Sequence, residues 1–327
     1  MHKKTILRAL SLSIVTALFS ACGGSSGGGN NVTATPDPQR YLERTFSNVD
    51  ITPEVTYYAG DTVLNRPALT MDIYTPAGDT RTDRPVIIIA FGGGFIAGDK
   101  DSVAGIATFF AEFGYVAAAI DYRVLGRQPV NADELTVAGL RATHDLFAAV
   151  RFFRSDANTT NTWGTRANAI FVAGVSAGGV MAANAAALDL TDTFTNPVLN
   201  DFFFNNGGVF GVRDINTAED SRPQGALSIS GALLELGTVD ADSAILYAAH
   251  EELDPVVPCG TAAEGSSSTG LVVSGGCVMV PAFEAANVAA ELFLVPNATT
   301  HVGFNAAQQI EFQTAAATLF FNEVIRQ

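Results

Sequence analysis

The chain has 327 residues, of which 48% are hydrophobic and 16% are charged, and its formal net charge at pH 7 is −15. This length and apolar content are sufficient for one large globular core. Lysine occurs only at positions 3, 4 and 100, so the acidic chain offers no basic surface for a phosphate backbone, and we expect no nucleic-acid partner.

Residues 1–21 are typical of an export signal. Lys3, Lys4 and Arg8 precede an apolar stretch, ALSLSIVTALFSA, that is too short to span a bilayer comfortably. The stretch ends in LFSACGG, which resembles the signal of bacterial lipoproteins. The resemblance implies a lipid on Cys22 and, because Gly23 rather than Asp follows, a location at the outer membrane, facing the periplasm or the surface. The alternative is an ordinary secretory signal and a secreted protein.

The exported chain divides into a tether and one domain. Residues 22–40 include GGSSGGGNN and are expected to form a flexible Gly/Ser-rich tether, while residues 41–327 are expected to form the domain. At the start of that domain, VTYYAG (55–60) and ALTMDIYTPAG (68–78) alternate in the manner of strands. They predict an antiparallel hairpin that turns at DTVLNRP.

The rest of the domain alternates between buried strands and helices. Apolar runs predict strands at 84–91, 115–123, 168–176, 225–230, 243–250 and 290–296, and helical spacing predicts helices at 101–114, 132–157, 177–190 and 306–325. This alternation predicts a three-layer α/β sandwich with a mostly parallel sheet, in which ligands bind beyond the carboxyl ends of the strands. Residues 191–222 interrupt the pattern and are a candidate lid or insertion. Within them, Phe202–Phe204 either line an acyl pocket or form a local cluster.

A lone serine follows one of the predicted buried strands. The stretch FVAGVSAGGV places Ser176 in a G-x-S-x-G pattern between a strand and a helix. Such a serine occupies a tight, strained turn that exposes its hydroxyl, and the small neighbours let strand and helix approach. The alternative is a plain tight turn after a strand.

Three glycines follow another buried strand. In IIIAFGGGFIAGDK, Gly92, Gly93 and Gly94 allow bare N–H groups to face a substrate oxygen. With the serine motif, this loop resembles the α/β-hydrolase superfamily, in particular its carboxylesterase and lipase branch with an HGGG loop. The resemblance implies an oxyanion hole made by the N–H groups of Gly93, Gly94 and Ala177. Phe91 stands where that branch has a histidine that supports the loop.

The acid is expected after the strand at 243–250. The segment HEELDPVVP (250–258) resembles the family pattern H-G-x-x-D-x-x-V-P, which implies that Asp254 is the acid and that His250 is a structural residue at the strand end. Glu251 replaces the glycine of that pattern, and register favours Asp254 over Glu251 and Glu252.

The base is expected after the last strand. His301 lies between that strand and the closing helix, and it completes the order serine, acid, histidine that the superfamily uses. His250 is the less favoured alternative. Tyr122 and Arg123 resemble a family feature that braces the oxyanion loop, and we expect that structural role for them.

The remaining cysteines are expected to be paired. An export signal implies an oxidising compartment, where Cys259 and Cys277, 18 residues apart, are expected to form a disulfide; two free thiols are the alternative. No His/Cys/Asp cluster has metal-ligand spacing, so we expect no metal and no cofactor.

The expected function is hydrolysis of carboxylic esters by a serine esterase through an acyl-enzyme. The expected substrates are small or aryl esters, with acetylated, feruloylated or polyester polymers as alternatives. A serine peptidase of the same fold and a non-catalytic binding protein that kept the fold are the rival functions.

Overall fold

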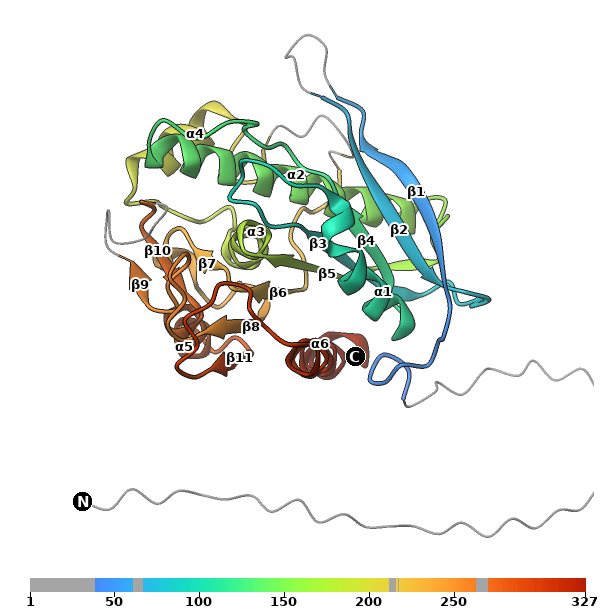
Figure 1. Cartoon of the computed structure of the whole chain (residues 1–327). Coiled ribbons are helices and arrows are strands. Elements are labelled where there is room, and N and C mark those ends of the chain that lie inside the picture. The colour runs from blue at the N-terminus through green and yellow to red at the C-terminus, as the bar shows by residue number, and fades with distance from the viewer. Residues whose placement is uncertain (1–38, 61–66, 212–215, 217, 263–269) are drawn as a thin grey trace, which may run out of the picture. The chain divides into compact units, whose positions relative to one another are not determined.

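An eight-stranded sheet forms the centre of the protein in a computed structural model, which describes residues 39–60, 67–211, 216, 218–262 and 270–327. Its strands lie in the order β1-β2-β4-β3-β5-β6-β8-β11 (Figure 1). They are β1 (Val49–Tyr58), β2 (Leu69–Pro76), β3 (Arg84–Ala90), β4 (Val116–Ile120), β5 (Thr165–Val175), β6 (Gly225–Ile229), β8 (Ile245–Glu251) and β11 (Ala290–Val295). The signal, the lipidation site at Cys22, the tether up to residue 38 and the turn at 61–66 lie outside the described residues.

The sheet is mostly parallel, as predicted. Only the pairings β1–β2 and β2–β4 are antiparallel, and the pairings from β4 through β3, β5, β6 and β8 to β11 are parallel. The predicted N-terminal hairpin is therefore confirmed. Residues Val86–Ala90 and Val116–Ile120 are fully buried, which explains why these stretches of β3 and β4 are apolar at every position rather than at alternate ones.

Helices cover both faces of the sheet and make it the middle of three layers. The helices are α1 (Ala104–Glu112), α2 (Ala132–Asn158), α3 (Ala177–Ala187), α4 (Pro197–Asn205), α5 (Gly276–Ala285) and α6 (Ala306–Phe320), the last continued by a π-helical turn at Phe321–Ile325. Figure 1 shows α2 and α3 on one face of the sheet and α1 and α6 on the opposite face. This arrangement confirms the predicted three-layer architecture.

Side-chain caps define where the long helices begin. The Asn131 side chain accepts a hydrogen bond from the Glu134 N–H at the start of α2. Asn305 and Gln308 form a reciprocal capping box at the start of α6. Such caps satisfy N–H groups that have no partner inside the helix, so these starts are specified locally by the sequence.

Three features of the fold differ from the predicted elements. A second, antiparallel sheet is separate from the main sheet and consists of β7 (Ala232–Leu233), β10 (Val273–Gly275) and β9 (Thr261–Ala262). Its strands are too short for their sequences to show a periodicity. Helix α5 was not predicted, and it contains Pro281, a residue type that is uncommon inside helices. The interrupting segment contains α4, whose start combines an Asn196 cap with Pro197 in the first turn.

Candidate active site

Ser176 lies on a strained turn between β5 and α3. Its φ of 54° and ψ of −116° are unfavourable for a non-glycine residue, and its N–H donates to the Ile229 carbonyl at 2.8 Å. A Cβ on Gly174 would lie 2.1 Å from the Gly178 oxygen, and one on Gly178 would lie 2.1 Å from the Ala90 oxygen. The glycines of the predicted motif are therefore required by the close approach of α3 to β5 and β3.

The three residues predicted to act together lie in one hydrogen-bonded row. The Ser176 Oγ is 2.8 Å from His301 Nε2, and His301 Nδ1 is 2.6 Å from Asp254 Oδ2. Since a carboxylate oxygen accepts, Nδ1 carries the proton, and Nε2 is left to accept from the serine hydroxyl. The residues follow β5, β8 and β11, whose carboxyl ends meet at the same edge of the sheet.

The Asp254 side chain is fixed by its own loop. Its carboxylate is fully buried, and Oδ1 accepts hydrogen bonds from the N–H groups of Val256 and Val257 at 2.8 and 3.0 Å. These bonds leave Oδ2 to face the imidazole. The aspartate is thus held in one orientation before any substrate binds.

His250 lies in a different position, inside the fold. Its Nε2 donates to the Val257 carbonyl at 2.8 Å, and its Nδ1 accepts from the Gly276 N–H at 3.3 Å. Burial lowers the pKa of His250 and favours the neutral ring that this bonding requires. Because both ring nitrogens are engaged by the backbone, His250 supports the loop of Asp254.

A buried carboxylate beside the row was missed by sequence reasoning. Glu251 is 1% exposed, and its Oε2 accepts from the Ser230 hydroxyl at 2.7 Å. Its Oε1 accepts from the Gly303 N–H at 2.5 Å, with the Thr300 hydroxyl at 3.5 Å. Thr300 and Gly303 flank His301, so Glu251 ties the loop of the histidine to the end of β6. The only signal in the sequence was that Glu251 replaces a family glycine.

The glycine loop adopts a backbone that only glycine tolerates. Gly93 and Gly94 have φ of 117° and 64°, and a Cβ on Gly93 would lie 1.9 Å from the Ala97 oxygen. Among the hydrogen bonds of the described residues, none uses the N–H of Gly93, Gly94 or Ala177 as donor. All three residues border the same cavity as Ser176, where these groups are available to a substrate oxygen.

Aromatic packing holds this loop in place. The Tyr122 hydroxyl donates to the Phe91 carbonyl at 2.8 Å, and the two rings stack with centroids 4.1 Å apart. Burial raises the pKa of Tyr122 and keeps its hydroxyl a neutral donor. Arg123 binds the Asp145 carboxylate at 2.6 Å and so joins the end of β4 to α2. Tyr122 therefore contacts the loop as expected, whereas the side chain of Arg123 contacts α2 rather than the loop.

The cavity at Ser176 has a volume of about 390 Å³, within the range of small-molecule sites. Its wall is mostly apolar and includes Phe95, Leu135, Val180, Val256, Val257, Leu271 and Val273. No described residue of the segment 191–222, the candidate lid, lines it.

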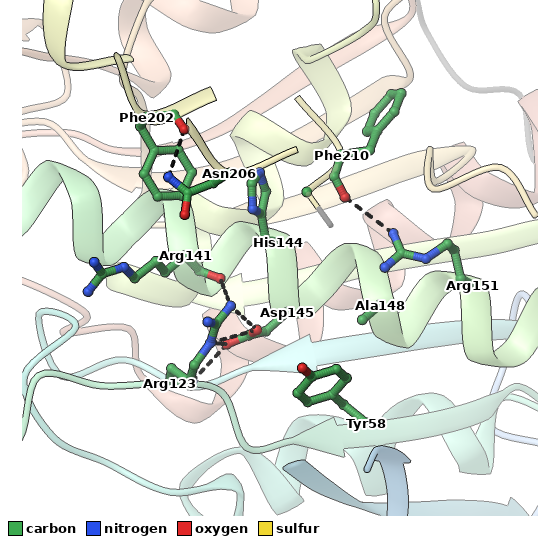
Figure 2. Close-up of a pocket in the computed structure, with 11 residues that line it drawn as sticks. Tyr58, Arg123, Arg141, His144, Asp145, Ala148, Arg151, Phe202, Asn206 and Phe210 are labelled. Atoms are coloured by element: carbon green, nitrogen blue, oxygen red, sulfur yellow. Dashed lines mark hydrogen bonds and ion pairs between the residues drawn. The ribbon is translucent and has the colours of Figure 1, made fainter. Parts of the chain in front are cut away.

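The phenylalanines of that segment pack elsewhere. Phe202 and Phe203 lie with ring centroids 5.0 and 6.0 Å from the ring of His144 on α2, while Phe204 is 89% exposed. These contacts favour the local cluster over the acyl pocket. Figure 2 shows a separate pocket at this place, where Phe202 lies near His144 and Arg123 is paired with Asp145.

The predicted disulfide between Cys259 and Cys277 is present in the structure. It joins the loop that follows Asp254 to the first turn of α5, where the Cys277 N–H also donates to the Cys259 carbonyl at 2.8 Å. The bridge therefore borders the segment that carries the acid.

The described part of the chain contains no group of three or more His, Cys, Asp or Glu side chains that could hold a metal ion. Within the same residues, no helix combines the length and the apolar content needed to cross a bilayer.

Comparison with known proteins identifies the fold. The profile of the BD-FAE family matches residues 71–217, and a search of curated proteins returned no match. Solved structures of esterase 2 from Thermogutta terrifontis are similar. The apo form is 21% identical, with a TM-score of 0.59, over 86% of this chain and 96% of that one. The form phosphorylated by paraoxon is 20% identical, with a TM-score of 0.60, over 85% and 95%. The butyrate-bound form is 19% identical, with a TM-score of 0.60, over 83% and 93%. The chain has the α/β-hydrolase fold.

Proposed function

We propose that this protein is a serine esterase that hydrolyses carboxylic esters through an acyl-enzyme. The observation that carries the proposal is the pair of hydrogen bonds from Ser176 to His301 and from His301 to Asp254, at 2.8 and 2.6 Å. This row lies beside a cavity bordered by three residues, Gly93, Gly94 and Ala177, whose N–H groups donate to no other described residue.

The reaction begins with attack by Ser176 on the ester carbonyl carbon. His301 accepts the serine proton at Nε2 as the bond forms, and Asp254 stabilises the imidazolium that results. The N–H groups of Gly93, Gly94 and Ala177 bind the oxygen that becomes negative, an effect of about 3 kcal/mol for one donor. This loop is the feature that relates the chain to the HGGG branch.

Collapse of the tetrahedral intermediate completes the first half of the reaction. The bond between carbonyl carbon and alcohol oxygen breaks, and His301 donates its Nε2 proton to the departing alcohol. Water then attacks the acyl-enzyme, giving its proton to His301, and the acid leaves while Ser176 recovers its hydrogen. No proton or electron has to come from a cofactor.

Similar proteins support small esters as substrates. The Thermogutta terrifontis esterase has been solved with butyrate and with propionate bound and after phosphorylation by paraoxon. The apolar cavity of about 390 Å³ suits a short alkyl or an aryl group. We therefore assign small or aryl esters, free or borne by a polymer, as the substrate class.

A fluorophosphonate probe tests the serine mechanism. The probe should label the wild type and not the Ser176→Ala variant, and that variant should lose about 10⁴-fold or more of its kcat on p-nitrophenyl acetate. Ser155→Ala is the matched control, because this serine of α2 lines no part of the cavity and should leave both readouts unchanged. Equal labelling of the Ser176→Ala variant and the wild type would refute the proposal.

We also propose that the protein is exported and anchored to the bacterial outer membrane by a lipid on Cys22. The support is the signal-like sequence of residues 1–21 and the Gly/Ser-rich composition that follows Cys22. A tether of this composition would let the hydrolase domain act at a distance from the membrane surface. If Cys22 carries no lipid, a secreted esterase is the remaining possibility.

A further inference from the structure

A second hollow lies on the face of the sheet that carries α1 and α6. Figure 1 shows where these two helices lie. The hollow has a volume of about 530 Å³ and lies between these two helices. Residues from Gly105 to Glu112 of α1 line it, and over that stretch the helix advances about 10 Å, at 1.5 Å per residue. We call this hollow the α1–α6 groove.

The α1–α6 groove adjoins the cavity at the serine. Val175 and Val302 line both hollows, and they are the chain neighbours of Ser176 and His301. The hydrogen bond between Ser176 and His301 lies on the cavity side of these two valines. An ester that reacts at Ser176 has one substituent on its carbonyl carbon and another on its alcohol oxygen. The cavity and the groove are two spaces that can receive them.

The two spaces differ in chemistry. The cavity wall is almost entirely aliphatic and aromatic apart from the reacting groups. The groove has an apolar base that includes Phe109 and Phe304, with polar side chains along it. At its far end the Arg44 guanidinium pairs with Glu112 at 2.6 Å.

A buried amide oxygen in the groove receives no hydrogen bond from the described part of the chain. Gln313 of α6 is 4% exposed, and its Oε1 accepts no hydrogen bond from any described residue. Buried amide oxygens are nearly always paired in folded proteins. A ligand hydroxyl would supply the missing donor if rotation of the Gln313 side chain turned its amide oxygen toward the groove.

Building on the proposed function, we propose that the α1–α6 groove binds one substituent of the substrate, an extended chain that carries hydroxyl and ether oxygens, while the cavity holds an apolar aryl or alkyl group. The substrate class is then an ester with substantial and chemically different groups on its two sides. The groove is a binding site, and none of its side chains takes part in bond making or breaking.

Gly105 offers a way to close the groove without touching the reacting residues. It lies in the first turn of α1, and a Cβ built on it would meet no atom within 4 Å. The variant Gly105→Phe should therefore place its ring in open space of the groove, and loss of a glycine from a helix favours folding. Ile310→Trp narrows the groove from α6, where Ile310 is 57% exposed, and serves as a second variant.

The test compares esters that do and do not reach the groove. Methyl benzoate fills only the cavity, whereas triethylene glycol monobenzoate adds a hydroxyl-ended chain. The benzyl ester of a glycol-ether acid of similar length has the aromatic group on the alcohol oxygen and the ether chain on the carbonyl carbon. In Gly105→Phe, kcat/KM should fall about tenfold or more for at least one extended ester, mainly through KM, with methyl benzoate within about twofold of wild type.

Gly237→Phe is the matched control. A Cβ on Gly237 also meets no atom within 4 Å, and this residue of the short helix Leu236–Thr238 lines neither hollow. It should leave kcat/KM unchanged for every ester. Ile310→Trp should reproduce the selective loss seen with Gly105→Phe.

The outcomes separate this inference from the proposed function. Selective loss on an extended ester supports the groove as a subsite. Unchanged kcat/KM on both extended esters in Gly105→Phe and Ile310→Trp, or an equal loss on methyl benzoate, overturns it while leaving the esterase in place. A wild-type protein that neither reacts with a fluorophosphonate nor hydrolyses any ester overturns the proposed function itself.

Discussion

At the scale of single residues, the candidate site depends on side chains that are held rigidly before substrate arrives. Asp254 has one carboxylate oxygen bound to two backbone N–H groups and the other bound to His301. His301 in turn reaches Ser176. Positioning of this kind lowers a reaction barrier because little reorganisation is left for the transition state.

Glu251 is the residue whose change tests this positioning most directly. Gln in its place keeps the volume but removes the negative charge that strengthens the hydrogen bonds from Ser230 and Gly303, so the loop of His301 should be held less firmly. We expect Glu251→Gln to lower kcat on p-nitrophenyl acetate about 10- to 100-fold with KM within about twofold, since small misplacements of a catalytic group have effects of this size.

The neighbouring residue provides the control for that experiment. Glu252 is exposed, and the one described group that donates to its carboxylate is the Asn297 N–H at 2.7 Å, so Glu252→Gln should keep its kcat. The rate of fluorophosphonate labelling should fall with kcat in Glu251→Gln. A fall in melting temperature with unchanged kcat and labelling would mean that Glu251 supports the fold alone.

At the scale of elements, side chains connect the segments that lie at one edge of the sheet, where β5, β6, β8 and β11 end. His250, at the end of β8, bonds to the Val257 carbonyl in the acid loop and to the Gly276 N–H at the start of α5. The disulfide links the same loop to the same helix. These connections place the acid relative to the strand that precedes it.

The buried His250 predicts a pH dependence of stability. Burial lowers the pKa of His250 in the folded state, whereas the unfolded chain takes up its proton near the ordinary value of about 6.5. The unfolded state therefore binds more protons than the folded state below about pH 6.5. The free energy of unfolding that comes from the neutral histidine is present above this pH and is lost as the pH falls. The melting temperature of the wild type should drop between about pH 7 and pH 5.

The variant His250→Gln isolates that contribution. Gln does not titrate and keeps a donor for the Val257 carbonyl, so the variant should be less stable than the wild type at pH 8. The difference in melting temperature should shrink as the pH is lowered to about 5, because only the wild type has a histidine at this position that gains a proton on unfolding. Parallel curves for the two proteins across this range would contradict the prediction.

At the scale of the whole molecule, one α/β-hydrolase domain carries the complete candidate site. The described residues include the hydrogen-bonded row of Ser176, His301 and Asp254, the glycine loop, the cavity and the α1–α6 groove. The proposed place of this domain at a membrane depends instead on the segment before it. An esterase with a binding site for extended groups would be suited to polymer-borne esters in the cell envelope or beyond it.

Membrane attachment through Cys22 has its own test. When the full chain is expressed in a bacterium supplied with radiolabelled palmitate, the wild type should take up label and sediment with the membranes. Cys22→Ala should take up none and should not sediment, while its kcat per labelled active site is unchanged, because the change lies outside the hydrolase domain. Sedimentation of Cys22→Ala with the membranes to the same extent as the wild type would exclude this anchor.

The sequence by itself determined the class of fold and the members of the candidate row. Buried parallel strands are apolar at every position, and a serine between glycines after such a strand implies a tight turn, so both can be recognised from a few adjacent residues. The hairpin, the mostly parallel sheet and the disulfide were predicted and are found. Asp254 and His301 were chosen by a family pattern and by order along the chain.

Only the tertiary structure decided what surrounds that row. The contacts of Glu251 join residues 21 and 52 positions apart, and no local pattern encodes them. The α1–α6 groove arises where two helices far apart in the chain cover the same face of the sheet. Local sequence specifies backbone conformation and burial through short-range sterics and periodicity, whereas cavities and buried polar contacts depend on which distant elements pack together.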